Sequence, residues 1–121
     1  MQPLSGIIVL DFCQFLAGSY CAMLLGDLGA EVIKIEKPGT GEAYRDYGPK
    51  FIGGESTSFL SVNRNKKSLT LNLKDPKGIS IARDLIKTTD VLIENFKPGV
   101  MERLGLGYAD VSMANPGLVY C

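Results

Sequence analysis

The stretch IIVLDFCQFLAGSYCAMLLGDLGAEVIKIE, residues 7–36, predicts a strand, a helix and a second strand. Residues 7–11 are a continuous run of β-favouring side chains, which is typical of a strand covered on both faces. In residues 20–30 the apolar side chains recur at helical spacing, and Gly29 is a typical helix end. Residues 31–36 are again rich in β-branched side chains. Two strands joined by a helix are the unit from which parallel sheets are built.

The chain continues with the same alternation. Residues 68–73 alternate polar and apolar side chains, which predicts a strand with one buried face. Asp75 and Pro76 are a typical N-cap and first residue of a helix, which we expect over residues 76–88. Residues 90–94 predict a fourth strand.

Residues 38–61 interrupt this alternation. They are rich in Gly, Pro, Tyr and charge without a sustained period, so we expect a long loop, and long loops inside domains are commonly functional. Two short helices are predicted over residues 100–104 and 109–113, and a last strand over 118–121. The predicted fold class is therefore α/β, a Rossmann-like, open and largely parallel sheet with flanking helices.

The last residues, NPGLVYC (115–121), predict a turn followed by the beginning of a buried strand. Domains rarely stop one step into a core strand, because termini usually lie at the surface. We therefore expect residues 1–121 to be an incomplete portion of a larger domain that is truncated at its C-terminal end.

The composition argues against several classes of protein. Lys plus Arg and Asp plus Glu number 13 each, so the basic excess of a typical nucleic-acid binder is missing. The apolar runs are far shorter than the roughly 20 residues that a membrane span needs. The N-terminus lacks the pattern of a secretory signal, so we expect a cytoplasmic location, with a mitochondrial one as the alternative if a transit peptide has been removed.

Metal binding and histidine-assisted catalysis are also disfavoured. The three cysteines, Cys13, Cys21 and Cys121, have no metal-site spacing, and the chain contains no His. We expect reduced cysteines that pack as small apolar groups, and no metal site. A Ser–His or Cys–His pair cannot form within these residues.

Three loops are expected at the carboxyl edge of the sheet, where open α/β sheets bind their ligands. In the first, Ala17, Gly18 and Ser19 lead into a helix whose free N–H groups suit an anion, although a glycine that only allows close packing is the alternative. In the second, Lys37 and Arg45 are candidate phosphate ligands or simply solvated charges.

Two further segments bear on a nucleotide ligand. Gly39 and Gly41 begin like a dinucleotide fingerprint, but Tyr44 stands where the third glycine should be, so an NAD site is disfavoured. The basic segment NRNKKS, residues 63–68, is either a solvated charge run or an attraction for a polyphosphate.

The third loop is the most informative of the three. Asn95 and Phe96 follow the fourth strand, and Arg103 lies on a short helix behind them. An amide, an aromatic face and a guanidinium together suit a nucleotide, because Phe can stack on a base and Arg can pair with a phosphate. The alternatives are that Phe96 belongs to the core and that Arg103 is a surface charge.

Several segments together are similar to the amino-terminal part of the class III CoA-transferases. These are PLSGIIVLDF, LAGSYCAMLLGDLGAEVIKIEKPGTGE, SVNRNKKSLTLNLKDPKG, TDVLIENFKPGVMERLGLGY and NPGLVYC. The family includes formyl-CoA transferase, carnitine CoA-transferase and the α-methylacyl-CoA racemases. The resemblance covers nearly all 121 residues in order, and the NRNKKS and ENFKPG segments resemble the succinate- and dicarboxylate-using transferases most.

The resemblance implies a coenzyme A site. The loop after the first strand would lie beside the thioester end of the bound acyl-CoA. Lys37 and Arg103 would meet its phosphates, and two pairs of residues would face each other across its adenine. The residues implied are Gln14, Phe15, Leu16 and Ala17 at the thioester end, Lys37 and Arg103 at the phosphates, and Leu71 and Leu73 opposite Asn95 and Phe96 at the adenine.

The resemblance also implies a mechanism. An aspartate attacks the acyl-CoA thioester, and CoA passes through an aspartyl-CoA thioester to a second carboxylic acid. That aspartate would lie beyond residue 121, so no catalytic residue is assigned in this chain, and the chain alone is expected to be inactive. Asp11 is expected to be structural. The expected partners are acyl-CoA, a carboxylic acid and, for the full-length protein, a second copy in an interlocked homodimer.

Two departures and two alternatives accompany this interpretation. Leu16 stands where formyl-CoA transferase has a glutamine that helps to hold oxalate, so an oxalate substrate is disfavoured. Ser19 replaces the usual proline after Ala-Gly. Within the family, the α-methylacyl-CoA racemase is the alternative function. From another class, a non-catalytic nucleotide-binding or interaction module is the alternative.

Overall fold

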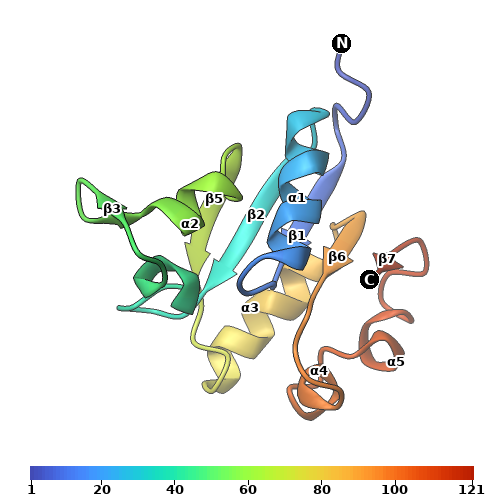
Figure 1. Ribbon diagram of the computed structural model, residues 1–121. Coiled ribbons are helices and arrows are strands. Elements are labelled where there is room, and N and C mark those ends of the chain that lie inside the picture. The colour runs from blue at the N-terminus through green and yellow to red at the C-terminus, as the bar shows by residue number, and fades with distance from the viewer.

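A five-stranded parallel sheet forms the centre of the computed structural model, which describes residues 1–121 (Figure 1). The sheet order is β5-β2-β1-β6-β7, and every neighbouring pair in it is parallel. The predicted α/β class with a largely parallel sheet is confirmed. The strands are β1 (Ile8–Asp11), β2 (Glu31–Glu36), β5 (Lys66–Thr70), β6 (Val91–Ile93) and β7 (Val119–Tyr120).

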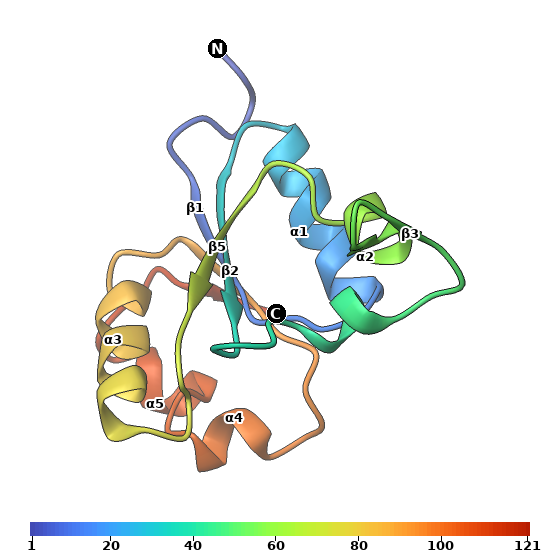
Figure 2. The same cartoon turned by 90° about the vertical axis from the view of Figure 1, so that its left-hand side faces the viewer.

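Helices cover both faces of this sheet, as Figure 2 shows with the sheet seen nearly edge-on. Helix α1 (Ala17–Asp27) lies on one face, and α3 (Pro76–Ile86) lies on the other together with α4 (Val100–Arg103) and α5 (Tyr108–Val111). No helix in the structure has both the length and the apolar character needed to cross a membrane.

Helix α3 begins where the sequence predicts. The Asp75 carboxylate accepts a hydrogen bond from the Lys77 N–H at 2.9 Å, and Pro76 occupies the first turn, where its missing N–H costs nothing. Gly78, Ala82 and Ile86 are buried at a spacing of four residues, which is the inward stripe of the helix.

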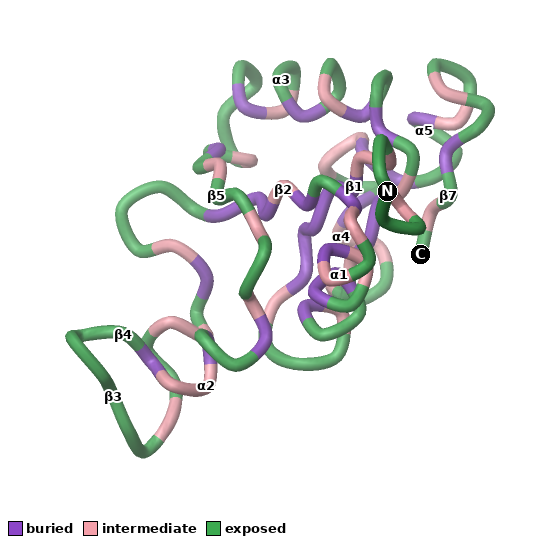
Figure 3. Tube along the Cα trace, turned by 90° about the horizontal axis from the view of Figure 1, so that it is seen from above, coloured by how far each residue is buried: buried purple, intermediate pink, exposed green.

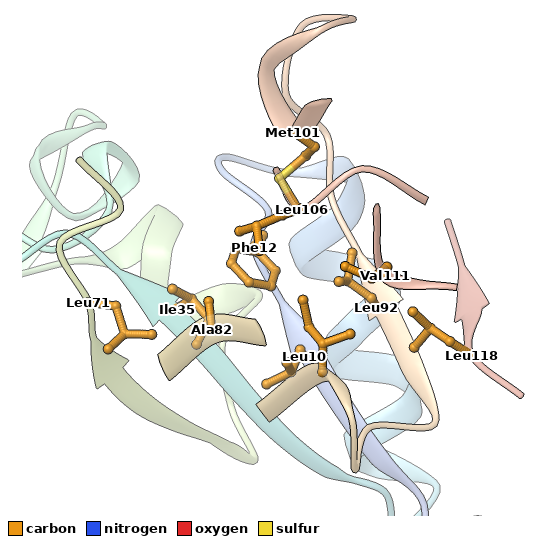
Figure 4. Close-up of a cluster of buried hydrophobic side chains, with 11 residues drawn as sticks. Leu10, Phe12, Ile35, Leu71, Ala82, Leu92, Met101, Leu106, Val111 and Leu118 are labelled. Carbon is orange, nitrogen blue, oxygen red and sulfur yellow. The ribbon is translucent and has the colours of Figure 1, made fainter. Parts of the chain in front are cut away.

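The sheet is buried on both faces because it separates two apolar clusters. Successive residues of β1 point to opposite faces, so Leu10 enters the cluster under α3 and Val9 enters the cluster under α1. Figure 4 shows the larger cluster, with side chains from β1, β2, α3, β6, α4 and α5 meeting around Phe12 and Leu92. Burial on both faces explains the unbroken apolar run in the sequence of β1.

The predicted loop over residues 38–61 contains short elements that the sequence did not indicate. They are η1 (Ala43–Asp46), the hairpin β3 (Phe51–Ile52) and β4 (Glu55–Ser56), and α2 (Thr57–Ser61). Two-residue strands and a five-residue helix are too short to produce a recognisable repeat of apolar side chains in the sequence. Figure 3 shows β3, β4 and α2 as mostly exposed or half-buried and apart from the buried strands β1 and β2.

One predicted strand is displaced along the chain. We expected residues 68–73, whereas β5 runs from Lys66 to Thr70 and pairs with β2 from Val32 onward. The apolar alternation continues past the strand because Leu71 and Leu73 leave the sheet and pack beside α3. Part of the basic segment therefore lies within the edge strand.

The strand order creates a topological switch point. Counted in chain order, the parallel strands lie 3-2-1-4-5, and the helices that follow β1 and β5 cover opposite faces of the sheet. The loops after β1 and β6 therefore separate at the carboxyl edge, and ligands of open α/β sheets bind at such a point.

Candidate functional site

A cavity of about 550 Å³ lies at the carboxyl edge of the sheet. Loops that follow β1, β2, β5 and β6 contribute to its wall, and α4 closes one side. Its main apolar residues are Phe12, Ile35, Leu71, Leu73, Phe96 and Leu104, and its charged residues are Glu36, Lys37, Glu42, Asp46 and Lys74. An apolar pocket with a few charged groups is typical of a small-molecule site.

Five of the ten predicted binding residues line this cavity, although they come from four separate segments of the sequence. They are Gln14, Lys37, Leu71, Leu73 and Phe96. The strand ends bring them together, since the carboxyl ends of parallel strands share one edge of the sheet.

Asn95 lies beside the cavity and joins the two loops of the switch point. Its Oδ1 accepts a hydrogen bond from the Gln14 N–H at 2.8 Å, and its Nδ2 donates one to the Gln14 carbonyl oxygen at 2.7 Å. The side-chain amide thus bonds Gln14 in the way a neighbouring strand would. The contacts of Asn95 assign it to shaping the edge of the site.

Phe15, Leu16 and Ala17 lie on the surface beside the cavity. Phe15 has the positive φ of 59° that side chains rarely adopt, and its ring packs against the rings of Tyr44 and Tyr47 at centroid distances of 5.5 and 5.9 Å. Leu16 and Ala17 begin helix α1, where the first N–H groups have no intrahelical acceptor.

Arg103 lines a neighbouring hollow between α3 and α4. Leu73, Lys74 and Leu104 contribute to both the hollow and the cavity, so the two are continuous along the surface. Neither Arg103, Lys37 nor Lys74 forms an ion pair with a carboxylate of the chain. The joined hollows therefore have three cations at their rim that are available to an anion.

Arg45, the other basic candidate of the second loop, is engaged within the protein. Its guanidinium donates two 2.7 Å hydrogen bonds to the Glu36 carboxylate and lies 3.9 Å above the ring of Phe59. Burial alone would raise the pKa of Glu36, but the bonds from Arg45, the Glu42 N–H and Ser68 outweigh it and lower that pKa to about 2. Of the two basic candidates in this loop, Lys37 rather than Arg45 is free of an internal carboxylate partner.

A cluster of four buried charges lies beneath the loop after β1. It comprises Asp11, Lys34, Glu42 and Lys66, whose side chains are at most 2% exposed. Burial lowers the pKa of Lys66, while the nearby Asp11 carboxylate opposes that shift. Burial disfavours the charged form of the neighbouring Cys13 thiol as well, which raises the pKa of that thiol.

Sequence reasoning considered Asp11 but missed Lys34, Glu42 and Lys66 as members of one cluster. A signal was present in β2, where Lys34 interrupts the apolar side chains of a strand buried on both faces. A charge at such a position needs a buried partner. The partner could not be identified, because Glu42 belongs to a loop without a period. Asp11 is buried and paired, in agreement with the structural role expected of it.

No group of three or more His, Cys, Asp or Glu side chains is arranged to hold a metal ion. The three cysteines are free thiols, and only Cys13 is buried.

Comparison with known proteins identifies the family that this chain matches. Residues 4–121 match the family described as CoA-transferase family III. The chain is 51% identical over 121 residues to the succinyl-CoA:glutarate CoA-transferase of Homo sapiens, covering 100% of this chain and 28% of that protein. It is 46% identical over 118 residues to the acetyl-CoA:oxalate CoA-transferase of Acetobacter aceti, covering 98% of this chain and 30% of that protein.

A solved structure shares the fold closely. The crystal structure of a CAIB/BAIF family protein from Brucella suis superimposes with a TM-score of 0.92 at 38% sequence identity. The match covers 99% of this chain and 32% of that one. The chain thus spans about a third or less of the length of these relatives.

Proposed function

The chain belongs to CoA-transferase family III, and we propose that it supplies the CoA-binding part of an enzyme that transfers CoA from an acyl-CoA to a carboxylic acid. The observation that carries this proposal is the cavity at the switch point, with an apolar wall and three unpaired cations at its rim. CoA has an apolar-faced adenine, three phosphates and a long thioester arm, so it needs both surfaces.

Each part of CoA has a counterpart in the site. Leu71, Leu73 and Phe96 form the apolar wall that we assign to the adenine. The cations Lys37 and Arg103 are assigned to the phosphates, since neither has an internal carboxylate partner. Both assignments coincide with the residues that the resemblance implies.

The thioester end is assigned to the loop after β1 and the beginning of α1, residues 14–17. The first N–H groups of an 11-residue helix favour negative charge, which develops on the carbonyl oxygen when a thioester is attacked. Asn95 holds Gln14 from the opposite loop, so the backbone beside the thioester is fixed from two sides.

The chemical step is assigned to an aspartate outside residues 1–121. Its carboxylate attacks the thioester carbonyl, releasing CoA thiolate and forming a mixed anhydride. The thiolate then attacks the aspartyl carbonyl, which releases the first carboxylic acid and leaves an aspartyl-CoA thioester. An acceptor carboxylate repeats these two steps in reverse and departs as the new acyl-CoA, while the aspartate is regenerated.

The acceptor is proposed to be a dicarboxylic acid. The human relative is named for succinyl-CoA and glutarate and the Acetobacter aceti relative for oxalate, which are dicarboxylates of different length. Leu16, in place of the glutamine that helps formyl-CoA transferase to hold oxalate, disfavours oxalate as the acceptor. The full-length protein is proposed to be a cytoplasmic, interlocked homodimer.

The test is CoA transfer by the full-length protein, with succinyl-CoA as donor and glutarate or oxalate as acceptor, followed by mass spectrometry of the acyl-CoA products. We expect glutaryl-CoA to form. Arg103→Ala and Lys37→Ala should each weaken CoA binding by roughly 10- to 100-fold, since a hydrogen bond to a charged group contributes about 1.5–3 kcal/mol.

Lys87→Ala is the matched control, because Lys87 lies at the far end of α3 from the cavity and pairs only with Asp84. CoA binding that is unchanged in both cavity variants would contradict the assignment. Exchange of an α-proton without CoA transfer would identify the racemase instead.

A further inference from the structure

The loop after β1 is held almost entirely by side chains. Cys13, Gln14 and Phe15 form no backbone–backbone hydrogen bond. Five of their six backbone polar groups nevertheless have a partner, and each partner is a side chain from another position. The path of this loop therefore depends on those side chains rather than on regular secondary structure.

Two of these side chains, Glu42 and Lys34, form a buried ion pair. The Lys34 Nζ lies 2.8 Å from the Glu42 Oε2, and both side chains are 2% exposed. The Glu42 Oε1 accepts a hydrogen bond from the Phe15 N–H, and the Lys34 Nζ donates one to the Cys13 carbonyl oxygen at 2.8 Å. The pair thus fixes the loop on both sides of Gln14, which lines the cavity.

A second pair keeps this buried region neutral. Asp11 lies 2.9 Å from the Lys66 Nζ and 3.6 Å from the Lys34 Nζ, and its Oδ1 accepts the Cys13 N–H at 2.8 Å. The Lys66 Nζ also donates to the Ser19 carbonyl oxygen at 2.8 Å. If Lys34 and Glu42 are both neutralised, the Asp11–Lys66 pair therefore stays intact. The Lys34–Glu42 pair can thus be removed without leaving an uncompensated buried charge.

The conformation of Phe15 indicates what the Glu42 contact does. Phe15 has a φ of 59°, which costs a residue with a Cβ free energy and persists only where surrounding contacts impose it. The Glu42 carboxylate holds the N–H of this same residue. Without that acceptor, the peptide between Gln14 and Phe15 would be free to turn, and the start of α1 would lose its fixed relation to the cavity.

We propose that Glu42 and Lys34 are positioning residues, whose buried ion pair holds the Phe15 amide and the Cys13 carbonyl so that Gln14 and the start of α1 keep the orientation needed at the reacting thioester. This inference rests on the proposed function, because it is the thioester end of an acyl-CoA that this loop would face. Neither side chain needs to touch the substrate.

The experiment compares two double variants of the full-length protein, because removing only one charge of a buried pair leaves the other uncompensated and invites unfolding. Lys34→Met with Glu42→Gln removes the ion pair but leaves an amide oxygen that can accept the Phe15 N–H. Lys34→Met with Glu42→Leu removes the ion pair and the acceptor together. The two variants differ only in the acceptor, and thermal unfolding confirms that both are folded.

We expect the Leu variant to have a kcat at least tenfold below that of the Gln variant, with the KM for acyl-CoA unchanged within about threefold. Hydrogen exchange of the Phe15 amide should be faster in the Leu variant by a similar factor. A purely structural pair would lower the unfolding temperature without separating kcat from KM. A kcat in both variants equal to that of the unaltered protein, or Phe15 exchange that is equal in all three proteins, would overturn the proposal.

The exposed pair Lys67–Glu31 is the matched control, since its atoms lie 2.7 Å apart, one of its residues also lies on β2, and it contacts no part of the loop. Lys67→Met with Glu31→Gln should leave both kcat and Phe15 exchange unchanged. If the unaltered full-length protein transfers no CoA, the proposed function fails. If it transfers CoA and both double variants keep its kcat, only the positioning role fails.

Discussion

At the scale of single residues, the wall of the cavity includes Glu36, a buried carboxylate that is kept ionised. Glu36 accepts four hydrogen bonds, two from Arg45 and one each from the Glu42 N–H and the Ser68 hydroxyl, and these hold its pKa at about 2. A carboxyl whose pKa is lower in the folded than in the unfolded protein stabilises the fold when it is ionised.

This pKa predicts how stability responds to acid. The contribution of Glu36 is fully present above pH 4.5, its ordinary pKa, and is lost as the pH falls toward about 2. We expect up to about 3 kcal/mol of the free energy of unfolding to be lost over this range, since one pKa unit corresponds to about 1.4 kcal/mol. Glu36→Gln should remove that part of the pH dependence, measured by urea unfolding between pH 7 and pH 2.

Glu55→Gln provides the comparison, because Glu55 is an exposed carboxylate that also faces Arg45, at 3.5 Å. It should retain the acid dependence of the unaltered protein. If the free energy of unfolding of the Glu36 variant fell with pH as steeply as that of the unaltered protein, the role given to these four hydrogen bonds would be contradicted.

At the scale of elements, the packing of α3 against the loop that follows β5 sets one wall of the cavity. Gly78 lies in the first turn of α3, and a Cβ at this position would overlap the Asn72 carbonyl oxygen of that loop. Asn72 and its neighbours Leu71 and Leu73 line the cavity, so this close approach fixes their distance from the helix.

Gly78→Ala should therefore be destabilising, although alanine is normally the better helix residue. We expect the free energy of unfolding to fall by about 1–3 kcal/mol, the usual cost of forcing extra volume into a packed contact. Ser80→Ala, at an exposed position of the same helix, should raise it by a few tenths of a kcal/mol. Urea unfolding of both variants checks this expectation. A stabilised Gly78 variant would show that the loop at Asn72 can move to accommodate the added methyl group.

The elements also show what sequence reasoning could and could not supply. The bounds of β2 and the start of α3 follow from the sequence, because β-branched runs and an Asp-Pro pair are strong local signals. The displacement of β5 to Lys66 could not be foreseen, since it depends on the pairing of this strand with β2, in which Lys66 lies opposite Val32. The sequence located the cavity residues that follow the strand ends. The cluster of buried charges beneath them could be recognised only from the tertiary structure.

At the scale of the whole molecule, one strand belongs to both halves of the core. Val9 and Leu10 of β1 enter the two opposite clusters, and β1 pairs with β2 on one side and β6 on the other. The two faces of the sheet should therefore unfold together rather than separately.

Leu10→Ala tests this coupling, because Leu10 is fully buried in the cluster under α3 only. We expect a loss of about 2–5 kcal/mol, as for other large-to-small changes in cores. Hydrogen exchange should accelerate by the same factor in α1 and in α3, although only α3 shares the altered cluster. Acceleration confined to α3 would show two independent halves, and Leu60→Ala, at an exposed position of α2, should affect neither.

The sheet order has a consequence for the order of events during synthesis on the ribosome. Val9 pairs with Val32 but also with Val91, so β1 must wait for 82 further residues before its second neighbour exists. At roughly 5–20 residues per second, that delay is about 4–16 s. Within it Lys34 emerges well before Lys66, so the Asp11 carboxylate meets one lysine early and its closer partner only later. We therefore expect the nascent chain to depend on its first strand–helix–strand unit until β6 pairs with β1.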